Sequence, residues 1–158
     1  MLWTLEVFGE PAPQGSKEPV GRDRAGRTVL VESSRKVKPW RLAVSTAAIE
    51  LRQPLIEAPV ELQIVFRFLR PKGHFGRRGL LPSAPLFMAK RPDLDKLERS
   101  TLDGLQGALL REDSQVCRLI GEKRYCEADE KPGATITIRV LNNDDAPEAT
   151  TAPGAPGG

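Results

Sequence analysis

Five short stretches of the chain have the residue pattern of β-strands. Strands are expected at residues 2–8, 28–31, 60–69, 116–125 and 135–141. Alternation is clearest at residues 60–69, where Leu62, Ile64, Phe66 and Phe68 occupy every second position. A strand with this pattern buries one complete row of side chains, so we expect residues 60–69 at the centre of a sheet.

Two longer stretches repeat apolar residues at the spacing of amphipathic helices. Trp40, Val44 and Leu51 mark a helix expected over residues 39–53, with Pro39 in its first turn. Leu97 and Leu105 mark a second helix, expected over residues 95–109. The order strand, strand, helix, strand, helix, strand, strand predicts an α+β fold, a single small domain with both helices packed on one mixed β-sheet.

Proline and glycine define the irregular parts of the chain. Residues 10–17 and 71–92 are rich in both residue types, and long loops of this kind are commonly functional. Residues 142–158 consist mainly of proline, alanine, glycine, threonine and acids without periodicity. We therefore expect a folded domain over residues 1–141 and a disordered tail over residues 142–158.

Composition narrows the class of protein. The 158 residues contain two cysteines and one histidine, too few for a disulfide scaffold or for most zinc sites. We expect Cys117 and Cys126 to be free, buried thiols. No apolar stretch approaches the roughly 20 residues of a membrane span, and the amino-terminal residues do not resemble a secretion signal. These features predict a cytoplasmic protein without a membrane partner.

Charge is unevenly distributed along the chain. Residues 1–141 hold 24 basic and 18 acidic residues, a net charge of +6, whereas the net charge of the whole chain is +3. An excess of positive charge on a small domain is compatible with a phosphate-rich partner. An ordinary solvated basic surface is the competing interpretation.

Two pairs of acids flank the second predicted helix. Asp93 and Asp95 stand at its start, and Glu112 and Asp113 follow its end. Carboxylates of this kind suit Mg²⁺, with Mn²⁺ as the alternative, and such a cation assists phosphodiester hydrolysis. However, the helix separates the pairs by about 20 Å, and a second subunit is one way to unite them. The structural alternatives are a helix cap at the first pair and a polar turn at the second.

Three ordered motifs resemble those of the RusA family of Holliday junction resolvases. They are KRPDLDKL at residues 90–97, LDGL at 102–105 and EDSQV at 112–116. A Pro- and Gly-rich segment at residues 9–17 and a basic segment before Trp40 are similar to the amino-terminal part of the family. The resemblance extends over about residues 2–141.

The resemblance implies a homodimeric, Mg²⁺-dependent endonuclease that makes paired nicks at four-way DNA junctions during recombination and repair. It implies Asp93, Asp95 and Asp113 as metal ligands, with Glu112 as a further acid. The position where the family usually has a catalytic lysine holds Arg99, which stays protonated and so cannot act as a base. Lys96 is the alternative source of an ammonium group, and Arg99 has the alternative role of an ion pair with Asp95.

Basic residues predict where DNA binds. The candidates for phosphate contacts are Lys17, Arg35, Lys36, Lys38, Arg41, Lys72, His74, Arg77 and Arg78. Solvated surface charge is the alternative for each cation, and a structural role is the alternative for His74.

Two other functions compete with junction resolution. One is a nucleic-acid-binding module of the same fold without catalysis, and the other is a nuclease with a broader preference for branched DNA. A resolvase would work in the cytoplasm, associated with the nucleoid when it acts on DNA.

Overall fold

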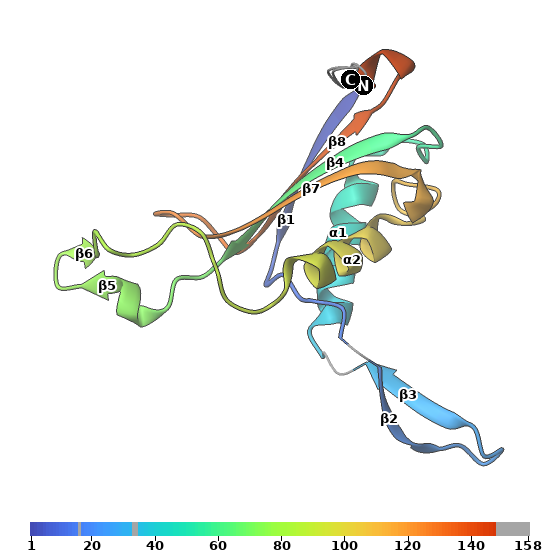
Figure 1. The fold of residues 1–158 in the computed structure, drawn as a ribbon, viewed down its shortest axis with the longest axis horizontal. Coiled ribbons are helices and arrows are strands. Elements are labelled where there is room, and N and C mark those ends of the chain that lie inside the picture. The colour runs from blue at the N-terminus through green and yellow to red at the C-terminus, as the bar shows by residue number, and fades with distance from the viewer. Residues whose placement is uncertain (16, 33–34, 148–158) are drawn as a thin grey trace, which may run out of the picture.

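A computed structural model describes residues 1–15, 17–32 and 35–147 and contains one four-stranded mixed sheet (Figure 1). Its strands are β1 (Leu2–Phe8), β4 (Val60–Phe68), β7 (Val116–Tyr125) and β8 (Gly133–Val140). In spatial order they run β1-β8-β4-β7. Strand β8 is antiparallel to β1 and β4, whereas β4 and β7 are parallel. The predicted α+β class with a mixed sheet is therefore confirmed.

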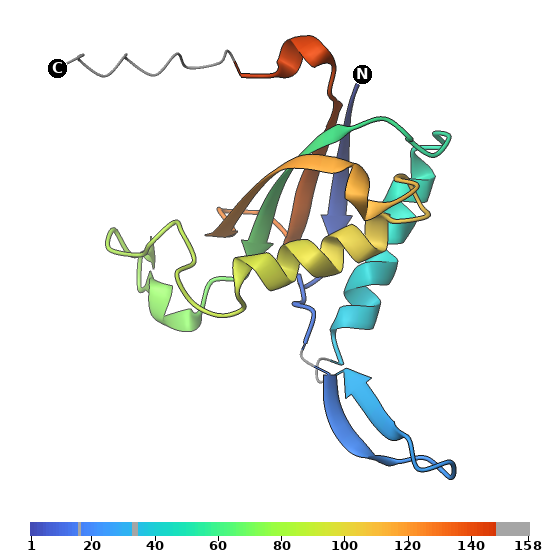
Figure 2. The same cartoon turned by 45° about the vertical axis from the view of Figure 1, so that its right-hand side comes forward.

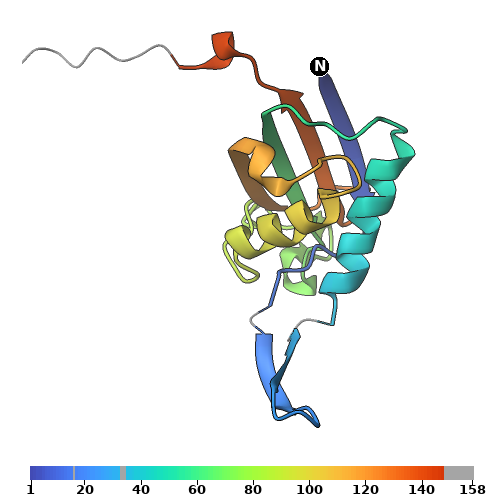
Figure 3. The same cartoon turned by 90° about the vertical axis from the view of Figure 1, so that its right-hand side faces the viewer.

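Both helices, α1 (Val37–Glu50) and α2 (Leu94–Leu105), cover the same face of this sheet (Figures 2 and 3). Alternate side chains of β4, including Leu62 and Phe66, are fully buried against them. Trp40 of α1 and Leu97 of α2 complete the same core cluster. Burying an apolar side chain of this size contributes roughly 1.5–3 kcal/mol, so this layer supplies the main stabilisation of the fold.

The motif at residues 102–105 holds the two helices together. The carboxylate of Asp103 pairs with the guanidinium of Arg41 at 2.9 Å. A Cβ atom at Gly104 would lie 2.8 Å from Cβ of Val44, closer than side chains normally approach. Glycine at this position therefore allows α2 to lie directly on α1.

One predicted strand lies outside the main sheet. Residues 28–31 fall within β3 (Thr28–Glu32), which pairs with β2 (Lys17–Arg22) in a separate hairpin that projects from the body (Figure 1). The prediction that all five strands form a single sheet is therefore wrong for residues 28–31. Strand β2 was missed because Pro19 and Gly21 interrupt its pattern, and the ladder shifts register between them.

The helix boundaries differ from prediction by one to four residues. Helix α1 begins at Val37 and ends at Glu50, and residue Arg52 then takes a positive φ of 52°. Helix α2 ends at Leu105 instead of residue 109, because Gly107 has a φ of 74° and turns the chain. The carbonyl of Leu105 accepts hydrogen bonds from the backbone N–H groups of residues 108–110.

The long loop predicted at residues 71–92 contains short ordered elements. They are the 3₁₀ turn η1 (Lys72–His74) and the small hairpin of β5 (Phe75–Gly76) and β6 (Gly79–Leu80). This hairpin projects from the opposite side of the body to β2 and β3 in Figure 1.

Two expectations about burial and order need correction. Cys126 is buried, but Cys117 is exposed because β7 is an edge strand of the sheet. The first residues of the expected tail are ordered, since Asn143–Asp145 form the 3₁₀ turn η3 and Asp145 pairs with Arg139. The remainder of that tail, residues 148–158, lies outside the described residues. Among the described residues, no helix is long and apolar enough to cross a membrane.

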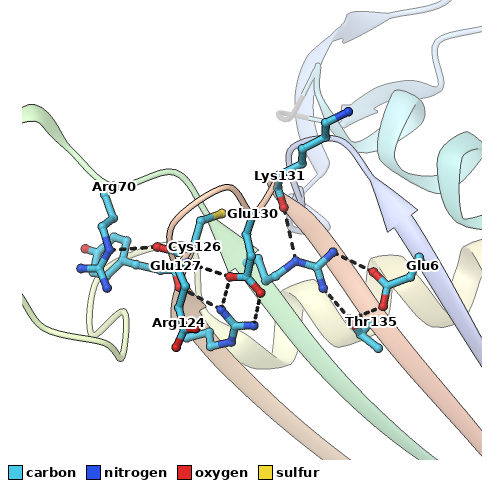
Figure 4. A network of polar contacts seen from close by, with 10 residues as sticks. Glu6, Arg70, Arg124, Cys126, Glu127, Glu130, Lys131 and Thr135 are labelled. Carbon is cyan, nitrogen blue, oxygen red and sulfur yellow. Dashed lines mark hydrogen bonds and ion pairs between the residues drawn. The ribbon is translucent and has the colours of Figure 1, made fainter. Parts of the chain in front are cut away.

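The face of the sheet that points away from the helices carries a polar network (Figure 4). The buried Arg67 donates hydrogen bonds to Glu6 and Thr135, and Arg124 forms two hydrogen bonds with Glu130. These bonds from Arg124 are the main reason that the pKa of Glu130 is lowered to about 2. The network therefore holds the carboxylate of Glu130 in the charged form.

Candidate active site

The first pair of acids stands at the amino-terminal end of α2. Asp93 has an extended backbone (φ −70°, ψ 141°) and is the N-cap residue, but its side chain makes no capping hydrogen bond. Asp95 follows in the first helical turn, where the helix dipole favours a negative charge. Both residues are exposed. The carboxylate of Asp93 is thus not used to start the helix and is accessible to a ligand.

Lys123 of β7 fixes the loop that carries Asp93. Its ammonium group donates hydrogen bonds to the carbonyls of Lys90 and Pro92, each at 2.7 Å. The backbone carbonyl of Lys123 in turn accepts a hydrogen bond from the N–H of Met88 at 3.1 Å. Sequence reasoning missed this positioning residue, because a lysine within a strand carries no signal for a contact 30 residues away.

A cleft of about 810 Å³ opens beside Asp93. One wall is the segment of residues 10–15, and the other includes Met88 and Arg91. The N–H of Gln14 donates to the carbonyl of Lys96 at 3.0 Å, and this bond ties the first wall to α2. The cleft therefore joins the carboxylate of Asp93 to the proline-rich segment that the sequence analysis singled out.

The two candidates for the catalytic cation differ in position. The ammonium of Lys96 lines the cleft and lies 3.2 Å from the carboxylate of Asp93. Arg99 is exposed on α2 and is not among the residues that line the cleft. Among the described residues no ion pair joins Arg99 to Asp95, the pairing considered as its structural alternative. Lys96 is thus the cation next to the acidic pair.

A third carboxylate that was not predicted lies near Asp95. Glu98 packs against Gly121 of β7. A Cβ atom added to Gly121 would collide with the carboxylate of Glu98 and lie 3.1 Å from the side chain of Leu94. Burial raises the pKa of Glu98, and the negative charge of Asp95 raises it further. Glu98 is recognised as part of this region only through the contact between α2 and β7. The spacing of acids in the sequence therefore could not predict it.

The second pair of acids lies in a turn at the other end of α2. Glu112 precedes the 3₁₀ turn η2 (Asp113–Gln115), and its N–H donates to Oε1 of Gln115 at 2.8 Å. The amide of Gln115 also donates to the carbonyls of Ile56 and Ala58, at 2.8 and 3.0 Å. The polar turn considered as the structural alternative is therefore present, with Glu112 and Asp113 both exposed.

The structure does not bring the two acidic pairs together within one chain. Helix α2 has 12 residues and is about 18 Å long. Asp93 and Asp95 stand at its amino-terminal end, and Glu112 and Asp113 follow its carboxyl-terminal end. Among the described residues no three histidines, cysteines or acids form a group that could hold a metal ion. One chain therefore offers Asp93 and Asp95 at one site and Glu112 and Asp113 at another.

The basic residues around α1 are partly engaged within the protein. Lys36 pairs with Glu10 at 2.8 Å, and Arg41 pairs with Asp103. Arg35 and Lys38 are exposed at the start of α1. Lys17 begins β2, but its side chain lies outside the described part of the chain.

The β5–β6 region divides into exposed cations and a structural histidine. Lys72, Arg77 and Arg78 are exposed. The ring of His74 packs edge-on against Tyr125 with centroids 4.8 Å apart, and its Nδ1 lies 3.4 Å from a guanidinium nitrogen of Arg70. These contacts favour the structural alternative for His74 and leave the three cations accessible to a phosphate backbone.

Comparison with known protein families identifies the class of enzyme. Residues 10–139 match the family described as endodeoxyribonuclease RusA, so the protein is of a class that cleaves DNA internally. Because the match covers most of the chain, the chain belongs to the RusA family, the family of Holliday junction resolvases that act in DNA recombination. A search of curated proteins gave no match.

Proposed function

We propose that this protein resolves Holliday junctions by Mg²⁺-dependent paired nicks, with Asp93 and Asp95 at the centre of each cutting site. The observation that carries the proposal is the exposed carboxylate of Asp93, which makes no capping bond and borders a cleft beside Lys96. Family membership supplies the DNA substrate. As a nuclease acting on the chromosome, the enzyme would work in the cytoplasm on nucleoid DNA.

The donor set of this end of α2 fits a magnesium ion. Mg²⁺ binds through one or two carboxylates and takes its remaining ligands from water and substrate phosphate. Asp93 and Asp95 supply two such carboxylates, and both residues are exposed. When bound there, the cation supplies positive charge to the phosphate and activates the attacking water. Mn²⁺ has similar preferences and would replace it.

The protein's own residues would orient the DNA and the acids. Lys96 holds the carboxylate of Asp93 through an ion pair and adds a positive charge next to the scissile phosphate. Arg99, exposed on the same helix, would bind a neighbouring phosphate as a permanent cation. Lys123 keeps the loop before Asp93 in place through its two carbonyl contacts.

We further propose that the enzyme acts as a homodimer whose partner chain supplies Asp113, with Glu112 as the accompanying acid. The argument is geometric, because the two pairs flank a helix about 18 Å long, and among the described residues of one chain no three acids form a group that could hold a metal ion. A two-fold axis would produce two equivalent sites, and a four-way junction presents two equivalent strands to cut.

A cleavage assay tests the proposal. Purified protein is mixed with a synthetic four-way junction, a Y-shaped duplex and a linear duplex, with Mg²⁺, with Mn²⁺ and with a chelator. We expect two symmetric nicks in the four-way junction that disappear with the chelator. Binding without cleavage in Mg²⁺ would support a non-catalytic module, and equal cutting of the Y-shaped duplex would support a broader nuclease.

A matched pair of variants controls for misfolding in the same assay. Asp93→Asn removes one proposed ligand, whereas Asp129→Asn makes the same chemical change at an exposed turn with a φ of 65°, a conformation that asparagine tolerates. Cleavage should be lost only in the first variant. Equal cleavage by both variants would exclude Asp93 from the site.

A further inference from the structure

The most prominent projection of the molecule is the hairpin arm, which consists of β2, β3 and the turn at residues 22–27. All three ribbon views show it extending away from the sheet and helices (Figures 1, 2 and 3). Strand β2 has six residues, so the arm reaches about 20 Å. Every described side chain in residues 21–29 is exposed, and the arm therefore buries little against the body.

The tip of the arm concentrates positive charge. Arg22, Arg24 and Arg27 stand within six residues, accompanied by a single acid, Asp23. In the described part of the chain none of these three guanidinium groups makes an ion pair. The sequence analysis did not include these arginines among the DNA contacts.

The single acid at the tip serves the turn itself. Oδ1 of Asp23 accepts hydrogen bonds from the N–H groups of Ala25 and Arg27, at 2.8 and 2.9 Å. The N–H of Asp23 donates to the carbonyl of Arg27 at 2.9 Å and closes the loop. Asp23 therefore gives the turn a defined backbone while the arginine side chains are exposed to solvent.

The cations nearer the cleft, unlike the arginines of the arm, form ion pairs within the protein. Lys36, Lys96 and Arg41 are each paired with a carboxylate of this chain. An unpaired guanidinium loses less when it binds phosphate, because it has no internal partner to give up, and its planar donors match phosphate oxygens.

The base of the arm is attached to the cleft. The segment of residues 10–15 that leads into β2 lines the cleft beside Asp93. Ser100 of α2 holds this segment through a 2.6 Å hydrogen bond to the carbonyl of Ala12, in addition to the bond between Gln14 and Lys96. DNA seated at Asp93 would therefore pass the base of the arm, with the arginine tip farther out along a branch.

We propose that the hairpin arm binds the phosphate backbone of a duplex branch outside the cleavage site, through Arg22, Arg24 and Arg27. The inference rests on the proposed function in one respect, since it takes Asp93 as the place where DNA is cut. The arm reads no sequence, because it touches phosphates alone. Removing one arginine that neutralises a phosphate should reduce the slope of log K against log salt by about 0.9.

Binding measurements without divalent cation test the arm independently of cleavage. We expect R24Q to lower the salt slope for a four-way junction by about 0.9, and R24Q/R27Q to lower it by about 1.8. R24K/R27K should retain the slope, because lysine keeps the charge. The control is R52N, which removes one exposed arginine at the far end of α1 and places asparagine at a φ of 52° that it tolerates. An unchanged slope in R24Q/R27Q, or an equal change in R52N, would overturn the proposal.

Shortening the DNA gives a second test. If the arm contacts a branch at a distance, trimming all four branches from about 20 to about 6 base pairs should remove the difference between the wild type and R24Q/R27Q. A difference that persists on the short junction would mean that the arginines contact DNA near the crossover, against the proposal. Cleavage of the full junction by the wild type in Mg²⁺ is scored separately, so failure of the nuclease assignment and failure of the arm give different results.

Discussion

The two ends of α2 carry the same chemistry in different surroundings. At the amino-terminal end, Asp93 makes no capping bond and faces a cleft, with Lys96 as its ion-pair partner. At the carboxyl-terminal end, Glu112 and Asp113 belong to a turn that Gln115 fastens to Ile56 and Ala58. The first pair is accessible next to cations, whereas the second is built into a rigid turn.

In the proposed homodimer, this difference would allow one site to be divided between two copies. A helix of 12 residues cannot bend its ends together, so the distance between the acidic pairs is fixed by the fold. A rigid turn is well suited to present an acid to another chain, because its geometry does not depend on the ligand. The two ends would then be two halves of one site, each incomplete alone.

The largest expected effect is loss of cleavage when either end loses its aspartate. Asp93→Asn and Asp113→Asn should each lower the rate of junction cleavage about 10³-fold, which corresponds to the several kcal/mol that a cation contributes to a phosphoryl transition state. Junction binding should persist or tighten, because a negative charge near phosphate is removed. Rates from single-turnover assays and affinities from gel shifts provide the measurement. A loss confined to Asp93→Asn would assign the reaction to the amino-terminal end alone.

A complementation experiment asks whether the two ends belong to different chains. Asp93→Asn and Asp113→Asn proteins are unfolded and refolded together, so that about half of the dimers contain one copy of each variant. In a shared site, one of the two sites of such a dimer has lost both acids, and the other has kept both. We therefore expect nicking to return to about a quarter of the wild-type level, on one strand per junction, whereas sites built within single chains would stay inactive.

The sequence predicted the parts of this comparison that depend on local pattern. The alternation at residues 60–69 gives the buried row of β4, and the apolar spacing of α2 gives a helix with an acidic pair near each end. Asp93 is the N-cap residue of α2, the position that the alternative interpretation as a helix cap requires. Its side chain nevertheless forms no capping hydrogen bond. Local sequence gives the position of a residue relative to the helix, but not what its side chain binds.

Other features depend on contacts between distant segments and could not be predicted. Lys123 reaches the carbonyls before Asp93 from a strand that follows the helix, and Glu98 meets Gly121 only because α2 packs on β7. Strand β2 was missed because Pro19 hides its pattern and its partner is β3 alone. The proposed union of the acidic pairs through a second chain could not be derived from the spacing of residues in one chain.

A moderate effect is expected when the anchor of either end is removed. Lys123→Met takes away two carbonyl contacts, and Gln115→Met takes away the two contacts of its amide and the acceptor for Glu112. Each should lower the free energy of unfolding by about 1–3 kcal/mol, measured by urea denaturation. Lys123→Met should in addition lower the cleavage rate about tenfold by releasing Asp93, without lowering junction affinity to the same degree. An unchanged cleavage rate in Lys123→Met would mean that other contacts hold Asp93 in place.

The smallest effect on cleavage is expected from the polar network on the opposite face of the sheet. The pKa of Glu130 is lowered from 4.5 to about 2, chiefly by its hydrogen bonds with Arg124. The folded state therefore favours the charged carboxylate. The stability that it contributes is fully present above pH 4.5 and is lost as the pH falls toward about 2.

Glu130→Gln should accordingly lower the free energy of unfolding by about 1–2 kcal/mol at neutral pH, less than the full pKa shift implies because solvent reaches both side chains. The difference between the variant and the wild type should shrink steadily as urea denaturation is repeated from pH 5 down to about 2.5. Cleavage per folded molecule should remain that of the wild type, since Glu130 lies at neither end of α2. A variant that kept its stability but lost cleavage would mean that this face of the sheet also takes part in the reaction, and the comparison between the two helix ends would then describe only part of the site.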